Sequence, residues 1–387
     1  MALKKDGFLD LDDESDSDPP FIQPVEFNIS EINIQTEQQN VDFVIDMLRH
    51  DEINMNTPFQ RSADLWKPPP MSRFIESMML KFPIPPFYFN ISYKQDKFGQ
   101  DIPDQPHWQV VDGLQRLSAI RRFIINSEQP SEVEPLRLTG LDFFTEYEGA
   151  TYDELPRNLK RNIHTCQISL FLIYPNTPKP VKHRIFERVN TGGLTLNHQE
   201  IRHALNQGQP DQILQDAVNS ALLENGIKIA PGRMRDRELA LRHLAFRLIP
   251  PSDYPGNMKV FLDEAMEKLN DVTAREAQRY IKDFASSVRL LNDVLGSLAF
   301  RKEDGARSLN RSLFDSYTVV IAELSLGERR LLRENAQEFI LQYKMSLSEK
   351  KSNEKYLDSI SAATARKDNI LLRFSVAKKV IGKVLNA

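Results

Sequence analysis

Strand-like patterns are confined to the first half of this chain, where helical patterns lie between them, and this distribution limits the folds that the chain can adopt. Three segments rich in aromatic and branched residues, bounded by Pro, Asn or Gly, favour strands: PPFYFN (85–90), HWQVV (107–111) and CQISLFLIY (166–174). From about Asp236 onward the alternation almost disappears, and helical stretches follow one another. The order predicts an α+β fold followed by an all-helical C-terminal region.

Apolar spacing and capping residues place several helices. The segment 71–82 has one apolar helix face that ends before Pro83, formed by Met71, Phe74, Ile75, Met78, Met79 and Phe82. The segment 180–190 shows the same spacing with Val181, Ile185, Phe186 and Val189. In the second half, TARE (273–276) and SLGE (325–328) predict capping boxes, and residues 249–257 and 300–308 predict breaks between helices.

Composition indicates a globular protein of the cytoplasm. Residues 1–18 hold seven Asp and Glu against two Lys, a net charge of −5, which leaves about +1 for the rest of the chain, and we expect a disordered acidic tail. The single cysteine, Cys166, excludes an internal disulfide framework and is expected in the core, and we find no leader pattern near the N-terminus. The longest apolar runs are too short to span a bilayer, so no membrane partner is expected.

The stretch VVDGLQRL (110–117) takes a strand directly into a helix. Asp112 stands at the expected N-cap with Gln115 three residues on, so a capping box accounts for both, and Gly113 eases the turn. Arg116 is left facing the positive end of the helix dipole, which is unfavourable unless an anion is present. A phosphate there would meet free N–H groups and a guanidinium, while Asp112 could hold a bridging metal ion. Both interpretations remain open at this point.

Two further stretches carry polar groups of the same kind. FERVNTGGLTLNHQEIRHAL (186–205) turns between two helices through Gly192 and Gly193, where a helix cap and an anion-binding loop are both possible. MNTPFQRSADLW (55–66) sets Gln60 and Arg61 after a proline turn. His198 and His203 flank a helix start and are expected to be exposed.

These three stretches, in this order, resemble the GmrSD-type restriction endonuclease N-terminal family over roughly residues 28–210. The resemblance implies a ParB/sulfiredoxin-like small mixed sheet with helices, and a role in prokaryotic defence against foreign DNA. Its D-G-Q-Q-R motif implies binding and hydrolysis of a nucleoside triphosphate with Mg²⁺. The implied catalytic residues are Asp112 and Arg116, with Asp112 also the metal ligand. The implied nucleotide-binding residues are Gly113, Gln115, Gln60, Arg61, Arg188, Asn190, Gly192 and Gly193.

The sequence departs from the family pattern at two places. Leu114 replaces the first Gln of D-G-Q-Q-R, so hydrolysis is less secure than binding. Many relatives carry an HNH nuclease module, which needs a histidine base beside a metal, but the last histidine here is His243. We therefore expect the nuclease to be a separate polypeptide. Other nucleophile and metal motifs are absent from the sequence.

Three functions are compatible with these sequence features. The first is a nucleotide-binding, NTP-hydrolysing subunit of a restriction-type defence system that acts with DNA and a separate nuclease. The second is a Mg²⁺-dependent ParB-like nuclease, with Asp112 and Glu187 or Glu200 as ligands. The third is a DNA-binding or scaffold protein without catalysis. The expected domains are a disordered tail (1–20), a GmrSD-type domain (21–235) and a helical domain (236–387); a homo-oligomer is compatible with all three functions.

Overall fold

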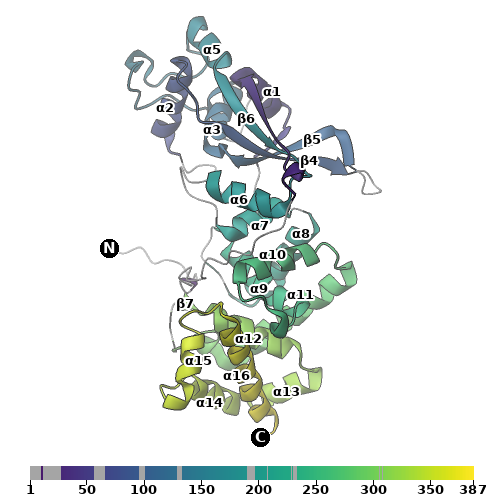
Figure 1. Cartoon of the computed structure of the whole chain (residues 1–387). Coiled ribbons are helices and arrows are strands. Elements are labelled where there is room, and N and C mark those ends of the chain that lie inside the picture. Colours follow the sequence, from purple (N-terminus) through teal and green to yellow (C-terminus); the bar gives the residue numbers. More distant parts are fainter. Residues whose placement is uncertain are drawn as a thin grey trace, which may run out of the picture. The chain divides into compact units, whose positions relative to one another are not determined.

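Two compact units make up the protein: residues 24–197 form one, and residues 198–387 together with residues 1–23 form the other. The structure is a computed structural model (Figure 1) that describes residues 10–11, 28–55, 66–95, 101–128, 133–189, 197–206, 208–227, 229, 233–304, 306 and 308–387. The division between the units falls at residue 197, whereas the loss of strand alternation in the sequence begins near residue 236. The helices α7 (His198–Leu205) and α8 (Gln209–Ala217), which lie in this interval, belong with the second unit.

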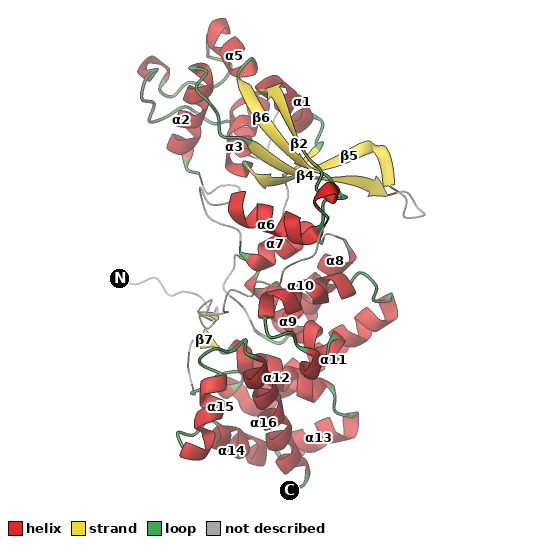
Figure 2. Ribbon diagram, in the orientation of Figure 1, coloured by secondary structure: helices red, strands yellow, loops and turns green. Residues whose placement is uncertain are grey.

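A five-stranded mixed sheet organises the first unit, as expected for the α+β class (Figure 2). The strand order is β2 (Ile34–Asn40), β6 (Gln167–Ile173), β4 (Phe87–Gln95), β5 (Asp101–Asp112) and β3 (Ile53–Asn54). Pairs β2–β6 and β4–β5 are antiparallel, and pairs β6–β4 and β5–β3 are parallel. The three sequence-predicted strands are confirmed as β4, β5 and β6.

One face of this sheet is buried under helices. Phe87, Phe89 and Ile91 of β4 point into a hydrophobic core with residues of α1 (Val41–Arg49), α2 (Pro68–Met79), α3 (Leu114–Ile120) and α5 (Arg157–His164). A π-helical segment, Arg121–Ile125, and the short α4 (Asn126–Glu128) continue α3. Because side chains alternate along a strand, Tyr88 and Asn90 point to the opposite face. At that face Asn90 accepts a hydrogen bond from Lys182 of α6 (Lys179–Val189).

Two helix predictions in this unit were correct in position but wrong in part of their apolar face. The helix α2 begins with prolines in its first turn and ends at Met79, so Phe82 lies beyond it and is 44% exposed. In α6 only Phe186 of the four predicted apolar residues is buried, and Lys182 is buried as well. Phe186 and Lys182 are four residues apart, so they share one helix face.

The second unit is a helical bundle with one short strand pair. The capping boxes Thr273–Glu276 and Ser325–Glu328 are both formed, and the predicted breaks fall between helices. Asp10 and Leu11 of the acidic segment form β1, which pairs in parallel with β7 (Ser308–Leu309). The helices are α7 (His198–Leu205), α8 (Gln209–Ala217), α9 (Arg235–Leu248), α10 (Met258–Lys268), α11 (Ala274–Leu295), α12 (Arg311–Ala322), α13 (Leu326–Glu334), α14 (Ala336–Ser346), α15 (Glu354–Ser359) and α16 (Lys367–Leu385).

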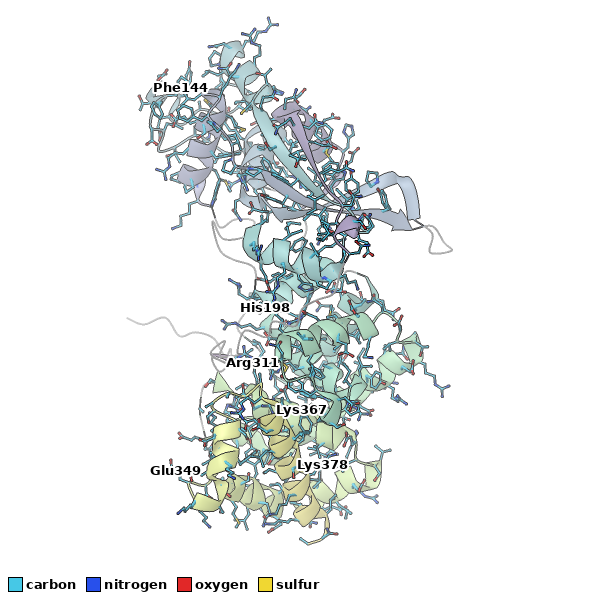
Figure 3. All side chains as sticks on the ribbon, viewed as in Figure 1. Phe144, His198, Arg311, Glu349, Lys367 and Lys378 are labelled. Carbon is cyan, nitrogen blue, oxygen red and sulfur yellow. The ribbon has the colours of Figure 1, made fainter. Side chains whose placement is uncertain are left out.

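Basic residues of α13 and α16 divide between surface and core. Lys378 on α16 is largely exposed and lies 3.4 Å from Glu323 (Figure 3). Arg329 and Arg373 are buried, and Arg329 donates to the carbonyl oxygens of Ile321 and Ala322. These two arginines therefore serve the core of the bundle. In the part of the chain that the structure describes, no helix combines the length and the apolar character that crossing a membrane requires.

Candidate nucleotide site

The junction between β5 and α3 requires glycine at position 113. Asp112 is the last residue of β5, and Gly113 follows with φ +104°, in the left-handed region that favours glycine. A Cβ at this position would lie 2.5 Å from Cδ1 of Phe87, whose ring is fully buried. Both the backbone angle and the close approach of the ring therefore exclude a side chain here.

Arg116 in the first turn of α3 is bound on several sides. Its Nη2 donates to Oδ2 of Asp112 at 2.5 Å, and its Nη1 donates to the carbonyl oxygens of Pro85 and Pro86. The guanidinium carbon also lies 4.8 Å from the ring centre of Phe87. Burial lowers the pKa of Arg116 from its ordinary value, and the charge of Asp112 opposes this shift, so the arginine stays charged.

Asp112 keeps contact with solvent although it is paired. Its side chain is 33% exposed, against 10% for Arg116. Arg116 is bonded to Oδ2, and Oδ1 accepts no hydrogen bond from the described residues. Arg116 thus fixes the carboxylate in one orientation with its second oxygen available.

Two sequence interpretations of this junction were wrong. Gly113, and not Asp112, occupies the N-cap of α3, and no side chain caps the helix. Gln115 does not close a capping box, because its Oε1 accepts a hydrogen bond from the backbone N–H of Trp66 at 3.0 Å. Arg116 is not an uncompensated charge against the helix dipole, since Asp112 and two carbonyl oxygens bind it. The position of Arg116 therefore no longer indicates an anion by itself.

The remaining predicted site residues are only partly described. Gln60, Arg61, Asn190, Gly192 and Gly193 lie outside the described residues. Arg188 lies in the last turn of α6 and is exposed. Leu114, the departure from D-G-Q-Q-R, is buried in the core of the first unit, so an amide at this position would lose its solvation.

A buried polar cluster on the second face of the sheet was not predicted from the sequence. Nζ of Lys182 donates to Oδ1 of Asn90 at 3.4 Å, and Nδ2 of Asn90 donates to Oε1 of Gln109 at 3.3 Å. All three residues are at least nine-tenths buried. The signal available in the sequence was Lys182, which stands four residues before Phe186 on the buried face of a predicted helix.

Other candidate residues have structural partners. Cys166 is buried, as predicted, and burial raises the pKa of its thiol. His198 is exposed as predicted, but the prediction for His203 was wrong: it is buried, with Nδ1 2.7 Å from Oδ1 of Asp211. The helix α7 buries several other polar side chains, among them Glu200, which pairs with Arg233 at 3.2 Å.

No metal cluster marks the site among the described residues. Within the described ranges, His, Cys, Asp and Glu side chains form no group of three that could hold a metal ion. Glu187, a ligand in the nuclease alternative, pairs with Arg184 at 3.1 Å. A cavity of about 500 Å³ lies elsewhere in the first unit, between Pro68, Arg122 and residues 134–139, and its lining does not include Asp112.

Comparison with known proteins gives a family match over part of the chain. Residues 44–206 match the family model described as the GmrSD restriction endonuclease, N-terminal domain. No curated protein and no solved structure matches the chain, so the ParB/sulfiredoxin-like part of the expectation stays a prediction. The matched range contains the strands β3 to β6, the β5–α3 junction and α6, whereas β2 precedes it. Residues 44–206 of the chain are therefore similar to the N-terminal domain of the GmrSD restriction endonuclease family.

Proposed function

We propose that this protein is a nucleotide-binding, NTP-hydrolysing component of a restriction-type defence system, and that it acts with DNA and a separate nuclease. The family match supports the restriction-type role. The observation that carries the nucleotide site is the Asp112 carboxylate, which is one-third exposed at the end of β5 and held by the buried Arg116.

The donor set near Asp112 fits a metal ion that arrives with phosphates. Mg²⁺ is commonly held by one or two carboxylates together with substrate phosphates, and it keeps several waters. Asp112 offers one carboxylate with Oδ1 available, whereas an all-protein metal site would need more ligands than the described residues gather. When bound, Mg²⁺ would neutralise charge on the phosphates.

The chain's own residues have distinct roles in this proposal. Asp112 binds the Mg²⁺–nucleotide complex, and Arg116 is a positioning residue that holds the carboxylate. Gly113 lets the chain turn while Phe87 stays in the core. Gln115, in the first turn of α3, accepts a hydrogen bond from the backbone N–H of Trp66, the last residue of the stretch 55–66 that carries Gln60 and Arg61.

Incubation of the full chain with each of the four NTPs and Mg²⁺ tests the function. Release of inorganic phosphate is the expected result. Plasmid nicking without any NTP would support the ParB-like nuclease instead. A DNA mobility shift with neither phosphate release nor nucleotide binding would support a DNA-binding scaffold and contradict the proposal.

A further inference from the structure

The polar cluster of Asn90, Gln109 and Lys182 has unused hydrogen-bond donors. The ammonium group of Lys182 has three N–H donors, and Oδ1 of Asn90 accepts a hydrogen bond from one of them. The oxygen of Gln109 accepts from Asn90, while its Nε2 is buried with no partner among the described residues. Both amide oxygens of the cluster therefore accept hydrogen bonds from within the cluster, while some of its N–H donors have no acceptor among the described residues. Buried polar groups of this kind usually have a partner, so a missing acceptor is the simplest explanation.

The cluster also carries positive charge without a counter-ion. In the part of the chain that the structure describes, no acidic side chain forms an ion pair with Lys182, which is only 7% exposed. Burial, with the charge of Lys179 adding to it, lowers the pKa of Lys182 to about 8. An isolated buried ammonium is unfavourable, and an anion that accepts its hydrogen bonds would offset that cost.

The cluster lies near Asp112 along the β4–β5 pair, with a register shift between the two positions. Asn90 pairs with Gln109, and Tyr88 pairs with Asp112 across the same two strands. Residues two apart on a strand share a face and are separated by about 7 Å. Tyr88 is half-buried and Asp112 is one-third exposed, so solvent reaches the strand pair beside the cluster.

We propose that Lys182 and Gln109 bind a phosphate group of the nucleotide whose Mg²⁺ is held at Asp112. This inference rests on the proposed function and adds a phosphate-binding residue outside the D-G-x-x-R motif. In this proposal the polyphosphate chain extends from Asp112 to the cluster. Duplex DNA is a poorer fit, because its backbone phosphates contact exposed basic side chains, whereas Lys182 is buried.

Two variants of the full chain separate this role from a structural one. Lys182→Met keeps the length of the side chain and removes its charge, and it should fold because it no longer buries an ammonium. Gln109→Glu keeps the shape of the amide and adds a carboxylate to the cluster, which would repel phosphate. Lys179→Met is the matched control, since Lys179 is an exposed lysine of the same helix.

Isothermal titration with MgATP, MgGTP, MgCTP, MgUTP and inorganic triphosphate measures the effect. Loss of a charge-assisted hydrogen bond should weaken binding roughly 10-fold to 150-fold in Lys182→Met, with a similar loss in Gln109→Glu. Lys179→Met should bind as the unaltered chain does. Equal nucleotide affinity in Lys182→Met and Gln109→Glu would overturn the inference and leave the proposed function standing.

Two further outcomes of this titration bear on the proposed function. Binding of triphosphate that depends on Lys182, with no binding of any NTP, would overturn the proposed function while supporting a phosphate site at the cluster. Binding of neither triphosphate nor nucleotides would overturn both.

Discussion

Replacing Gly113 by alanine should destabilise the first unit through two separable effects. A non-glycine residue held at positive φ costs on the order of 1–3 kcal/mol. The new Cβ would also lie 2.5 Å from Cδ1 of Phe87, and overpacking of a fully buried ring adds about 1–3 kcal/mol. We expect Gly113→Ala to lower the free energy of unfolding of this unit by roughly 2–6 kcal/mol.

Gly149→Ala is the matched control for the backbone term. Gly149 lies in the same unit with φ +82°, and a Cβ there would meet nothing within 4 Å. The difference between the two variants therefore isolates the contact with Phe87. Trp66 and Trp108, the only tryptophans of the chain, both lie in this unit, so fluorescence-detected urea unfolding follows it. Equal destabilisation in the two variants would refute the role assigned to the ring.

Two predictions concern the helical unit. Asp315→Asn should destabilise it by about 3–5 kcal/mol in urea unfolding followed by circular dichroism, because the fully buried carboxylate compensates Arg242 at 2.7 Å and Arg373 at 3.5 Å. Asp293→Asn, at an exposed pair, is the control and should change stability by less than about 1 kcal/mol; a similar change in both variants would contradict the reasoning. Burial raises the pKa of Tyr317 to about 12, whereas an unfolded tyrosine ionises near pH 10. The contribution of protonated Tyr317 to the free energy of unfolding should therefore be complete below pH 10 and be lost as the pH rises from about 10 toward 12. Alkaline titration of phenolate absorbance with circular dichroism checks this, and ionisation of every tyrosine near pH 10 with no loss of structure would contradict it.

Sequence patterns predicted the parts of the fold that are governed by burial. The strands β4, β5 and β6 were predicted because they are rich in aromatic and branched residues. The two capping boxes were predicted from their local sequence pattern. The strand β2 was missed because IQTEQQN is polar and mostly exposed, as an edge strand that pairs on one side can be. Its position depends on pairing with β6, which is distant in sequence and invisible to a local pattern.

The sequence identified the residues of the β5–α3 junction but not their partners, and their role in a nucleotide site stays a prediction. Asp112, Gly113 and Arg116 lie together at the β5–α3 junction, as the D-G-x-x-R pattern indicates. The partners of Arg116 could not be predicted, because the carbonyl oxygens of Pro85 and Pro86 come from a loop about thirty residues earlier in the sequence. Arg116→Ala is consequently a poor test of ligand binding, since it would leave these buried groups without their partner.

Binding of a Mg²⁺–nucleotide complex by Asp112 is tested most directly by the increase in melting temperature that saturating nucleotide with Mg²⁺ produces. Asp112→Asn removes the charge and keeps an oxygen that can accept from Arg116, so its melting temperature without nucleotide should stay near that of the unaltered chain. Asp46→Asn, at an exposed aspartate of the same unit, is the control. We predict that nucleotide raises the melting temperature of the unaltered chain and of Asp46→Asn, and has no effect on Asp112→Asn. An equal increase in Asp112→Asn would contradict the assignment of Asp112 to the nucleotide site.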